Sequence, residues 1–502
     1  MIARIHTAAV HGIEAQAVST EVALASALPS FGIVGLPQGA VREGKERVAA
    51  ALRASGFSLP NKRITVNLSP GDVRKEGTGF DLPIALGILV ASGAIPETGP
   101  GDSLVLGELG LDGSLRRVPG VLSVARYARR TARSLVVPDV CAPEAARVEG
   151  LTVYGASDLA EVVAHMTGEA PISPTTGEVP FPEPRRSPGV DLSEIRGHGV
   201  PKRALTIAAA GAHNVLFVGP PGAGKTMLAR ALPGLLPALT RAEALDVATI
   251  HSVARRDAES GIPAHRPFRA PHHTASYAAV LGGGRPIRPG ELSLAHRGVL
   301  FLDEFPEFPR HVVEALRQPL EDGTIRIDRV DGSVTFPARV QLVLAMNPCP
   351  CGFADTDADD RCGCDPAQVA RYRRKASGPL LDRIDLFCPV RALAGDEATA
   401  WEEGSTESSA VRRVVTAAHQ TQLARGHEGG VTNAEMNTSD LRRWCALDAR
   451  GDELVRAAVD RMALSGRAVD RLRRVARTIA DLEGVAGVDV SHLSEALQYR
   501  PH

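Results

Sequence analysis

The stretch NVLFVGPPGAGKTMLARAL, from Asn214 to Leu232, predicts the fold of the central part of this chain. Its apolar run Val215 to Val218 is expected to form a strand, and leucines at helical spacing follow the glycine-rich loop. A strand, a loop of the form GxxxxGKT and a helix, in this order, make a phosphate site, because loop N–H groups and the positive end of the helix converge on an anion. The other interpretation is a glycine turn that binds nothing. The match of all eight loop residues favours the phosphate site.

The residues of this loop have separate expected roles. The proposed cradle consists of Gly219, Pro220, Pro221, Gly222, Ala223, Gly224, Lys225 and Thr226. Lys225 is one of only six Lys among 57 basic residues, and we expect its ammonium group to neutralise β- and γ-phosphate oxygens. We expect Thr226 to present its hydroxyl group to Mg²⁺. The sequence therefore predicts ATP and Mg²⁺ as cofactors.

Two later apolar runs end in polar residues that fit the same site. GVLFLDEF places Asp303 and Glu304 at the end of a predicted strand, and VQLVLAMNP ends at Asn347. Adjacent strand residues point to opposite faces, so the two carboxylates should have different roles. We expect Asp303 to hold the water shell of Mg²⁺ and Glu304 to activate the attacking water, unless the strand simply runs into an acidic turn. Asn347 is a candidate for contacting the γ-phosphate or that water, although Asn before Pro is also a common turn residue.

The composition is that of an ordinary globular chain. Apolar residues make up 44% and charged residues 23%, and the formal net charge is -1. A nucleic-acid partner would therefore have to bind a local basic surface. The N-terminus has no apolar signal segment, and the run Leu82 to Pro96 is too short to span a bilayer. We expect a cytoplasmic protein with no membrane contact.

The chain divides into four predicted parts. Residues 1–165 alternate β-branched runs with helical patterns, which is typical of an α/β or α+β domain. A Pro-rich linker is expected at 166–190, and the alternating strands and helices of 191–395 indicate a mainly parallel sheet. Residues 396–502 carry apolar residues at helical spacing and are expected to form a small helical lid.

Four of the seven Cys lie close together as two C-x-C pairs. The pairs are Cys349 with Cys351 and Cys362 with Cys364. Four thiolates can complete a tetrahedral Zn²⁺ site, and such a site is structural because no position is left for water. The spacing is tighter than the usual C-x-x-C, so redox cysteines or free thiols are the alternative. His272 and His273 are weaker metal candidates, for which a capping role or a contact at the nucleotide edge is preferred.

Two alternating runs predict a β-hairpin just before the Asn347 strand. They are TIRID and SVTFPA, on either side of the turn RVDG. Arg326, Arg329 and Arg339, with RYRRK at Arg371 to Lys375, would form a basic surface that grips phosphates without reading sequence. A solvated hairpin without a ligand is the other interpretation. Aromatic residues make up only 4% of the chain, so base stacking is not expected as the main contact.

Taken together, these motifs resemble AAA+ ATPases of the magnesium-chelatase-subunit type, and more closely the bacterial YifB/ComM family. The most specific segments are DLSEIRGHG at Asp191, RPFRAPHHTAS at Arg266, GELSLAHRGVLFLDEFPEF at Gly290, PARVQLVLAMNPCPCG at Pro337, SGPLLDRIDLF at Ser377 and LSGRAVDRLRRVARTIADLEG at Leu464. The resemblance implies a hexameric ring in which Arg383 is an arginine finger that acts on the neighbouring subunit's nucleotide. It also implies that Arg467 in the lid senses the γ-phosphate, with Arg471 as the second choice. Without the resemblance, the arginines of this segment would indicate a solvated or nucleic-acid-facing helix.

The first domain is similar to the Lon-protease and ribosomal-S5-like module. RKEGTGFDLPIALGIL resembles the segment that carries the nucleophile in true Lon proteases, and GELGLDGSLRRVPGVL follows where the general-base Lys would lie. Here the two positions fall on Gly79 and near Leu122, whose side chains cannot form or activate a nucleophile. We therefore expect no proteolysis, and a structural module or one that binds a protein partner.

For the whole chain, the resemblance implies an oligomeric ATPase that acts on DNA by strand separation or branch migration during DNA uptake. A protein-remodelling or magnesium-chelatase-type ATPase would use the same hydrolytic residues, so the nucleotide site does not separate the two. A nucleotide-binding switch with slow turnover is a third interpretation. The DNA motor is the leading hypothesis.

Overall fold

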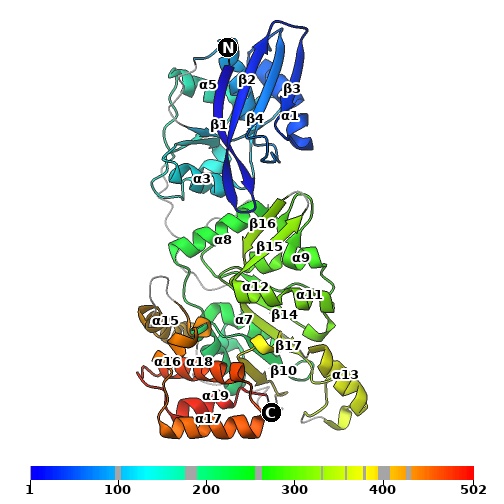
Figure 1. Ribbon diagram of the computed structural model, residues 1–502, viewed down its shortest axis with the longest axis vertical. Coiled ribbons are helices and arrows are strands. Elements are labelled where there is room, and N and C mark those ends of the chain that lie inside the picture. The colour runs from blue at the N-terminus through cyan, green and yellow to red at the C-terminus, as the bar shows by residue number, and fades with distance from the viewer. Residues whose placement is uncertain are drawn as a thin grey trace.

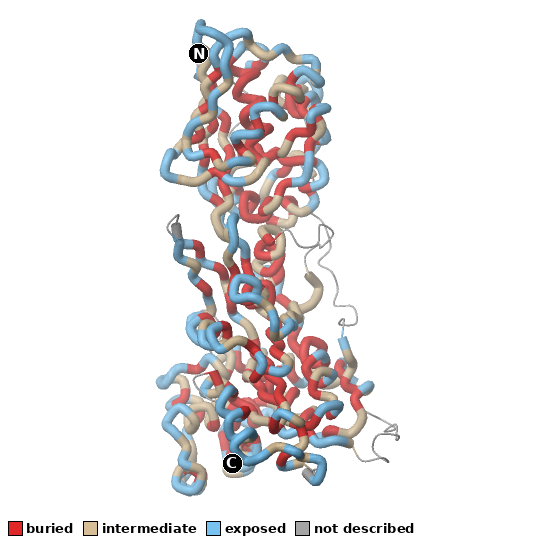
Figure 2. The backbone as a smooth tube through the Cα atoms, turned by 90° about the vertical axis from the view of Figure 1, so that its right-hand side faces the viewer, coloured by how far each residue is buried: buried red, intermediate tan, exposed pale blue. Residues whose placement is uncertain are grey.

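The computed structural model describes residues 2–96, 103–175, 189–254, 263–329, 332–356, 359–376, 380–393, 407–425 and 431–501. Figure 1 shows an elongated molecule with the N-terminal part at one end and the C-terminal helices at the other. The sheet that carries the glycine-rich loop lies in the half next to these helices. Buried residues fill the interior of both halves (Figure 2).

A four-stranded sheet opens the N-terminal part. Its strand order is β1 (Ile2–His11), β2 (Glu14–Ala25), β4 (Arg63–Ser69) and β3 (Ser30–Val34). Helices α1 (Gly39–Ala54) and α2 (Asp81–Ser92) accompany it, and α2 packs on β1 and β2. Nearly every residue of α2 is buried, as its continuous apolar sequence requires. Asp81 at its start is paired with Arg47 of α1 at 2.7 Å, so this buried charge is compensated.

The rest of the N-terminal part is a second small α/β layer. Its parallel sheet has the order β5 (Leu104–Val105), β8 (Leu135–Pro138) and β9 (Val153–Ala156), beside the hairpin of β6 (Glu108–Leu109) and β7 (Leu115–Arg116). Its helices are α3 (Val121–Arg130), η1 (Asp139–Cys141), α4 (Ala142–Ala145) and α5 (Leu159–Thr167). A Cβ on Gly79 would lie 2.7 Å from Leu106, and Leu122 is buried in α3. The likeness to the Lon-protease and S5 module stays a prediction.

Five parallel strands carry the glycine-rich loop, as predicted. Their order is β11 (Phe268–Arg269), β14 (Val299–Leu302), β17 (Gln341–Met346), β10 (Val215–Val218) and β18 (Leu386–Pro389). Every pairing between neighbours is parallel. Because the carboxyl ends of parallel strands meet at one edge, the segments that follow β10, β14 and β17 lie together there. β17 is buried along its whole length, which is typical of a central strand covered on both faces.

Helices and two hairpins surround this sheet. The helices are α6 (Gly199–Gly211), α7 (Lys225–Leu235), α8 (Arg241–Ala254), α9 (Tyr277–Leu281), α10 (Glu291–Leu294), α11 (Arg310–Ala315), α12 (Arg317–Asp322) and α13 (Pro366–Ala376). Shorter 3₁₀ turns are η2 (Leu192–Glu194), η3 (Phe305–Glu307), η4 (Asp359–Arg361) and η5 (Leu381–Arg383). The antiparallel hairpins pair β12 (Gly282–Gly283) with β13 (Arg288–Pro289), and β15 (Thr324–Arg329) with β16 (Gly332–Pro337). The second hairpin confirms the predicted one, although turn residues 330 and 331 lie outside the described residues.

The C-terminal region is helical, as predicted. It contains α15 (Ser408–Arg425), η6 (Asn433–Glu435), α16 (Thr438–Trp444), α17 (Ala449–Met462), α18 (Gly466–Leu482) and α19 (Val490–Leu497). Leu472 of α18 and Leu205 of α6 belong to one buried core, so the lid packs directly on the nucleotide-binding part. The predicted boundary at 395 and most of the predicted linker lie outside the described residues. Among the described helices, none is both long enough and apolar enough to cross a membrane.

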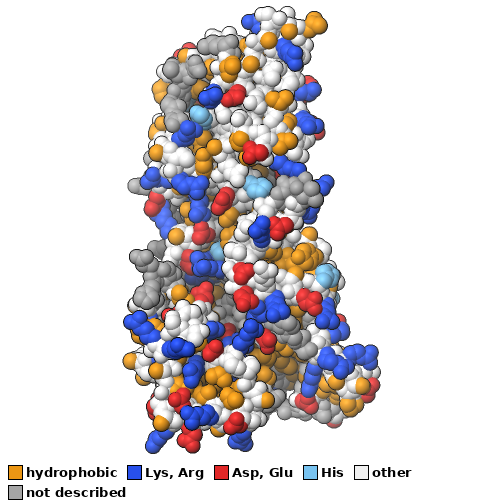
Figure 3. All heavy atoms as spheres, in the orientation of Figure 1, with side chains coloured by type: hydrophobic (Ala, Val, Ile, Leu, Met, Phe, Trp, Pro, Cys, Tyr) orange, Lys and Arg blue, Asp and Glu red, His pale blue; other side chains and the backbone are white. Residues whose placement is uncertain are grey.

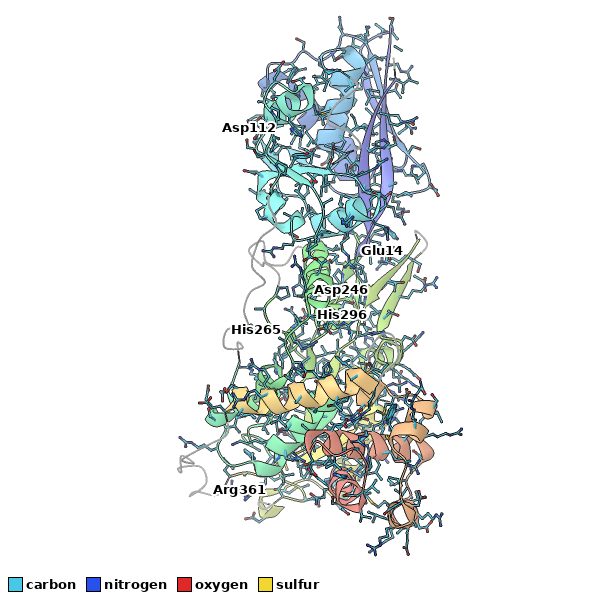
Figure 4. The ribbon with its side chains drawn as sticks, turned by 90° about the vertical axis from the view of Figure 1, so that its left-hand side faces the viewer. Glu14, Asp112, Asp246, His265, His296 and Arg361 are labelled. Carbon is cyan, nitrogen blue, oxygen red and sulfur yellow. The ribbon has the colours of Figure 1, made fainter. Side chains whose placement is uncertain are left out.

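The two halves meet at the turn between β1 and β2. Ile13 of this turn packs against the core that contains Val334 of β16. Gly12 has a φ of 65°, and a Cβ there would lie 2.6 Å from Val334 Cγ1, so the close approach requires glycine. Arg126 of α3 pairs with Asp246 of α8 at 2.8 Å. Figure 4 shows Glu14 and Asp246 at this junction.

Candidate nucleotide site

The glycine-rich loop joins β10 to α7 at the carboxyl edge of the sheet. A Cβ on Gly219 would lie 2.0 Å from the carbonyl oxygen of Val390, so no side chain fits there. Gly222 and Gly224 have φ angles of 77° and 82°, in the left-handed region that favours glycine. Lys225 is the first residue of α7. The backbone N–H groups at the N-terminus of α7 therefore converge at the loop, where an anion can bind.

The side chain of Lys225 is buried and turned back onto this loop. Its Nζ donates to the carbonyl oxygens of Gly219 at 2.7 Å and Pro220 at 2.8 Å, and to Oδ1 of Asn347 at 3.0 Å. Burial lowers the pKa of Lys225, while two nearby carboxylates, Asp303 first, raise it. Asn347 reaches this position because β17 lies next to β10. The ammonium group is thus surrounded by neutral oxygens that phosphate oxygens can replace.

Thr226 and Asp303 are in contact although they are far apart in sequence. Oγ1 of Thr226 donates to Oδ2 of Asp303 at 2.8 Å. Only β17 separates the strands that precede them, so the strand order brings the two side chains to the same place. A hydroxyl and a carboxylate are hard oxygen donors of the kind that Mg²⁺ and its water shell prefer. The residues present therefore fit a magnesium ion.

Glu304 has an uncommon backbone conformation. Its φ of 50° lies in the left-handed region, and its N–H donates to Oδ1 of Asp303 at 3.0 Å. This turn separates the two carboxylates, because Asp303 points toward Thr226 while the side chain of Glu304 remains 60% exposed. Oε2 of Glu304 lies 3.2 Å from Nδ1 of His273. An exposed carboxylate held at one oxygen leaves the other oxygen free to contact water.

For His272 and His273 the sequence indicated a capping role or a contact at the nucleotide edge, but it did not indicate Glu304 as the partner of His273. His273 follows β11, another strand of the sheet, so a polar residue after this strand was the signal that could have indicated it. Its neighbour His272 instead bonds Oγ1 of Thr274 through Nδ1 at 2.8 Å. Neither histidine belongs to a group of metal ligands within the described part of the chain.

A second histidine beside the loop was also missed. His198, in the segment DLSEIRGHG, is buried and precedes α6 with a φ of 56°. Its Nε2 would lie 3.5 Å from a Cβ built on Gly224. The left-handed turn at His198 therefore places an imidazole against the last glycine of the loop, where a bound nucleotide would lie.

Arg383 lies at the end of the sheet opposite the loop. Its carbonyl oxygen accepts from Nδ2 of Asn214 at 2.9 Å, and Asn214 directly precedes β10. The guanidinium group pairs with Glu321 of α12. The four residues of β10, at about 3.3 Å each, separate this position from the loop. Arg383 is therefore not part of its own chain's nucleotide site.

The two lid arginines were candidates for sensing the γ-phosphate. Nε of Arg471 lies 3.7 Å from Oδ1 of Asp385, at the same end of the sheet as Arg383. Arg471 therefore points away from its own chain's loop. Arg467 is exposed on the first turn of α18, and its role stays a prediction.

The four cysteines of the predicted cluster come together. The sulfur atoms of Cys349, Cys351, Cys362 and Cys364 all lie within 4.8 Å of one another. The cluster begins two residues after Asn347, so it lies close to the nucleotide site. Four sulfur donors of this geometry are compatible with Zn²⁺.

Three family models match the chain. Magnesium chelatase, subunit ChlI, matches residues 191–398; subunit ChlI of Mg-chelatase matches 20–140; and magnesium chelatase, subunit ChlI C-terminal, matches 405–500. The parallel sheet, the loop and these matches define an AAA+ protein of the magnesium-chelatase type, a class of ATPases.

Full-length relatives identify the family within this class. The chain is 43% identical to competence protein ComM of Haemophilus influenzae, over 99% of this chain and 97% of the relative. It is 39% identical to the uncharacterized protein YifB of Escherichia coli, over 99% and 96%. The magnesium-chelatase 38 kDa subunit of Rhodobacter capsulatus is 31% identical over 32% of this chain and 51% of its own length. The chain belongs to the YifB/ComM family.

Proposed function

We propose that this protein is a cytoplasmic, ATP-hydrolysing oligomeric motor that acts on DNA as a helicase or in branch migration during DNA uptake. The observation that carries the proposal is the continuity between the β15–β16 hairpin and the nucleotide site. β16 leads into β17, and β17 ends at Asn347, which contacts Lys225. A movement of Asn347 in response to the γ-phosphate can therefore be transmitted along β17 to the β15–β16 hairpin, which carries the exposed Arg326.

The hydrolytic roles follow from the contacts in the site. Bound ATP with Mg²⁺ supplies the phosphoanhydride bond. Thr226 and Asp303 would hold the metal and its water shell, and Lys225 would exchange its carbonyl partners for phosphate oxygens. Glu304 takes the proton from the attacking water, and Asn347 contacts the γ-phosphate.

The two arginines of β15 lie on opposite faces of the hairpin, because Arg329 shares a face with Ile325 and Ile327 whereas Arg326 is on the other face. Ile325 and Phe336 face each other on the buried side, whereas Arg326 faces Thr335 on the exposed side. Arg326 is 68% exposed and bonds Asp328 and Ser333 within the hairpin. Figure 3 shows Lys and Arg side chains gathered on the lobe formed by α13, which carries Arg371 to Lys375. Such surfaces bind the DNA backbone through phosphates.

Two further observations support an oligomer on DNA. Arg383 lies too far from its own loop to act there, so it acts on the nucleotide of a neighbouring subunit, together with Arg467, in a hexameric ring. The relative with 43% identity is named a competence protein, which points to DNA uptake.

The second candidate is a protein-remodelling or magnesium-chelatase-type ATPase. The similarity to the magnesium-chelatase 38 kDa subunit favours it. The N-terminal part contacts the hairpin directly at the β1–β2 turn, where Nε2 of His11 lies 3.3 Å from the carbonyl oxygen of Ser333, so a protein bound to this part could act on the same hairpin.

ATPase and strand-displacement assays on forked and four-way DNA separate the two candidates. We expect DNA to stimulate ATP hydrolysis, and Lys225→Ala to abolish both hydrolysis and displacement. Arg326→Ala should keep the basal ATPase rate but lose most of the stimulation, with a weaker dependence on salt. Arg310→Ala is the control, because Arg310 is 91% exposed on α11 and is not on the hairpin. Hydrolysis that DNA does not change, with no displacement, would support the protein-remodelling candidate instead.

A further inference from the structure

We infer that the four clustered cysteines bind one Zn²⁺ ion and that this site holds the glycine-rich loop in the conformation that binds nucleotide. The inference rests on the proposed function only in that the loop binds ATP. It adds a metal site whose role is to set the affinity of the loop for nucleotide.

The separations between sulfur atoms fit a tetrahedral thiolate site. They are 3.3 Å between Cys349 and Cys351, 3.6 Å between Cys351 and Cys362, and 3.8 Å between Cys349 and Cys362. A disulfide would bring two sulfur atoms to about 2.05 Å, which is much shorter. Four thiolates at about 2.3 Å from a central Zn²⁺ are about 3.8 Å apart. The observed separations are close to the edges of such a tetrahedron.

Backbone N–H groups also point at the buried sulfur of this group. The amides of Gly352 and Ala354 donate to Sγ of Cys349 at 3.2 and 3.3 Å. N–H donors stabilise negative charge on sulfur, as a thiolate ligand requires, and a buried thiolate needs a cation nearby. Four sulfur donors select Zn²⁺ rather than Mg²⁺, so this ion is distinct from the magnesium that accompanies ATP.

The cysteine segment packs directly on the loop. A Cβ on Gly352 would lie 2.4 Å from Cδ and 2.8 Å from Cγ of Pro221. The glycine between Cys351 and Phe353 is thus in van der Waals contact with the second proline of the loop. Gly352 also has a φ of 93°, so both the space and the backbone require glycine.

The same segment is anchored at its start. Tyr372 of α13 is buried, and its phenol interacts with the backbone of Asn347. Nε of the adjacent Arg373 donates to the carbonyl oxygen of Pro348 at 3.2 Å. The segment that follows β17 is therefore held by α13 at Asn347. The inferred Zn²⁺ ion holds it at Cys349 and Cys351.

The consequence concerns the conformation of the loop. With the metal bound, Gly352 is fixed against Pro221, and Asn347 stays within reach of Lys225. Without the metal, the segment loses the constraint at Cys349 and Cys351. The glycine-rich loop then loses the fixed packing contact between Gly352 and Pro221. ATP binding then has to order both the cysteine segment and the glycine-rich loop, and this cost weakens the affinity for ATP.

Metal content and nucleotide affinity are measured on the full chain, without DNA. Inductively coupled plasma mass spectrometry should find one zinc per chain after purification in reducing buffer. Cys362→Ser should lose zinc and raise the Kd for a fluorescent ATP analogue about tenfold or more, while circular dichroism confirms the fold. Cys141→Ala is the control, because Cys141 is buried in the N-terminal part and lies outside the cluster.

A glycine pair tests the contact with the loop independently of the metal. Gly352→Ala should keep zinc and weaken nucleotide binding, whereas Gly363→Ala should change neither, because nothing lies within 4 Å of a Cβ on Gly363.

A chain without zinc, or cysteines that form disulfides, overturns the metal site. An unchanged Kd in Gly352→Ala overturns the coupling. Failure of the DNA assays leaves both results standing, and absence of ATP binding in the zinc-loaded parent chain would instead reject the proposed function.

Discussion

The orientation of Glu304 depends on a single described partner. Its exposed carboxylate lies 3.2 Å from His273, and the left-handed turn that positions it is a conformation that few non-glycine residues adopt. His273 does not contact the phosphate loop in any described hydrogen bond, so it acts as a positioning residue.

His273→Ala should lower kcat about tenfold, with little change in KM for ATP, because Glu304, the proposed general base, would lose its fixed orientation. His273→Asn should recover part of the rate, since its amide nitrogen reaches the place of Nδ1. His272→Ala is the matched control, because His272 bonds Thr274. Steady-state ATPase kinetics distinguish the variants, and equal losses in His272→Ala and His273→Ala would contradict the role.

His296 links pH to stability at a buried position. Burial lowers the pKa of His296 to about 4, and its Nδ1 accepts from the backbone N–H of Arg339 at 3.1 Å (Figure 4). Between pH 6.5 and 4 the unfolded chain binds a proton that the folded chain does not, so stability falls as pH decreases. The full loss, reached below pH 4, is about 3 kcal/mol.

His296→Asn should flatten this dependence, because Asn keeps an acceptor for Arg339 but does not titrate. Thermal unfolding between pH 7 and 5 measures it, with the melting temperature of the parent falling faster than that of the variant. Parallel curves would show that another group causes the acid sensitivity.

At the scale of elements, the β15–β16 hairpin has two different faces. Its buried side belongs to the core against which Ile13 of the N-terminal turn packs, while Arg326 lies on the other side. The ion pair between Arg126 and Asp246 at the same junction is partly exposed and contributes at most about 1 kcal/mol. Apolar contacts add to this attachment, because Ile13 packs on the cluster that contains Ile250 of α8, and Ala248 of α8 belongs to the core of the N-terminal part.

Ile13→Asp should loosen the N-terminal part from the hairpin, because it places an unpaired carboxylate against an apolar core. Hydrogen–deuterium exchange should increase in β16 and α8. Ile2→Asp is the control, because Ile2 is 65% exposed at the other end of β1. Unchanged exchange in β16 would show that other contacts hold the junction.

At the scale of the whole molecule, one chain contains both halves of the shared site that the proposed function requires. The loop lies at one end of β10 and Arg383 at the other. In the proposed function a neighbouring copy brings its Arg383 to the loop, and this arrangement needs a closed ring.

Mixing inactive variants tests this arrangement. Lys225→Ala and Arg383→Ala should each lose about 10³-fold or more of the ATPase rate. Mixed rings, however, contain some interfaces with an intact loop and an intact arginine, so mixing should restore part of the activity. If the mixture is no more active than the two separate variants, Arg383 does not act across subunits.

The sequence by itself determined the features that depend on neighbours along the chain. The glycine-rich loop, the strands that end at Asp303 and Asn347, the hairpin and the helical C-terminal region were all predicted, because spacing and periodicity encode local structure. The two C-x-C pairs also indicated a cluster.

Only the tertiary structure decided which distant groups meet. It placed His273 on Glu304, Gly352 on Pro221, Gly12 on Val334 of the hairpin, and Arg383 at the far end of β10. These contacts depend on the strand order and on how the two halves pack, and neither leaves a regular pattern in a single sequence. The physical reason is that side-chain contacts between remote segments are set by the packing of whole elements, whereas the phosphate loop is built from consecutive residues.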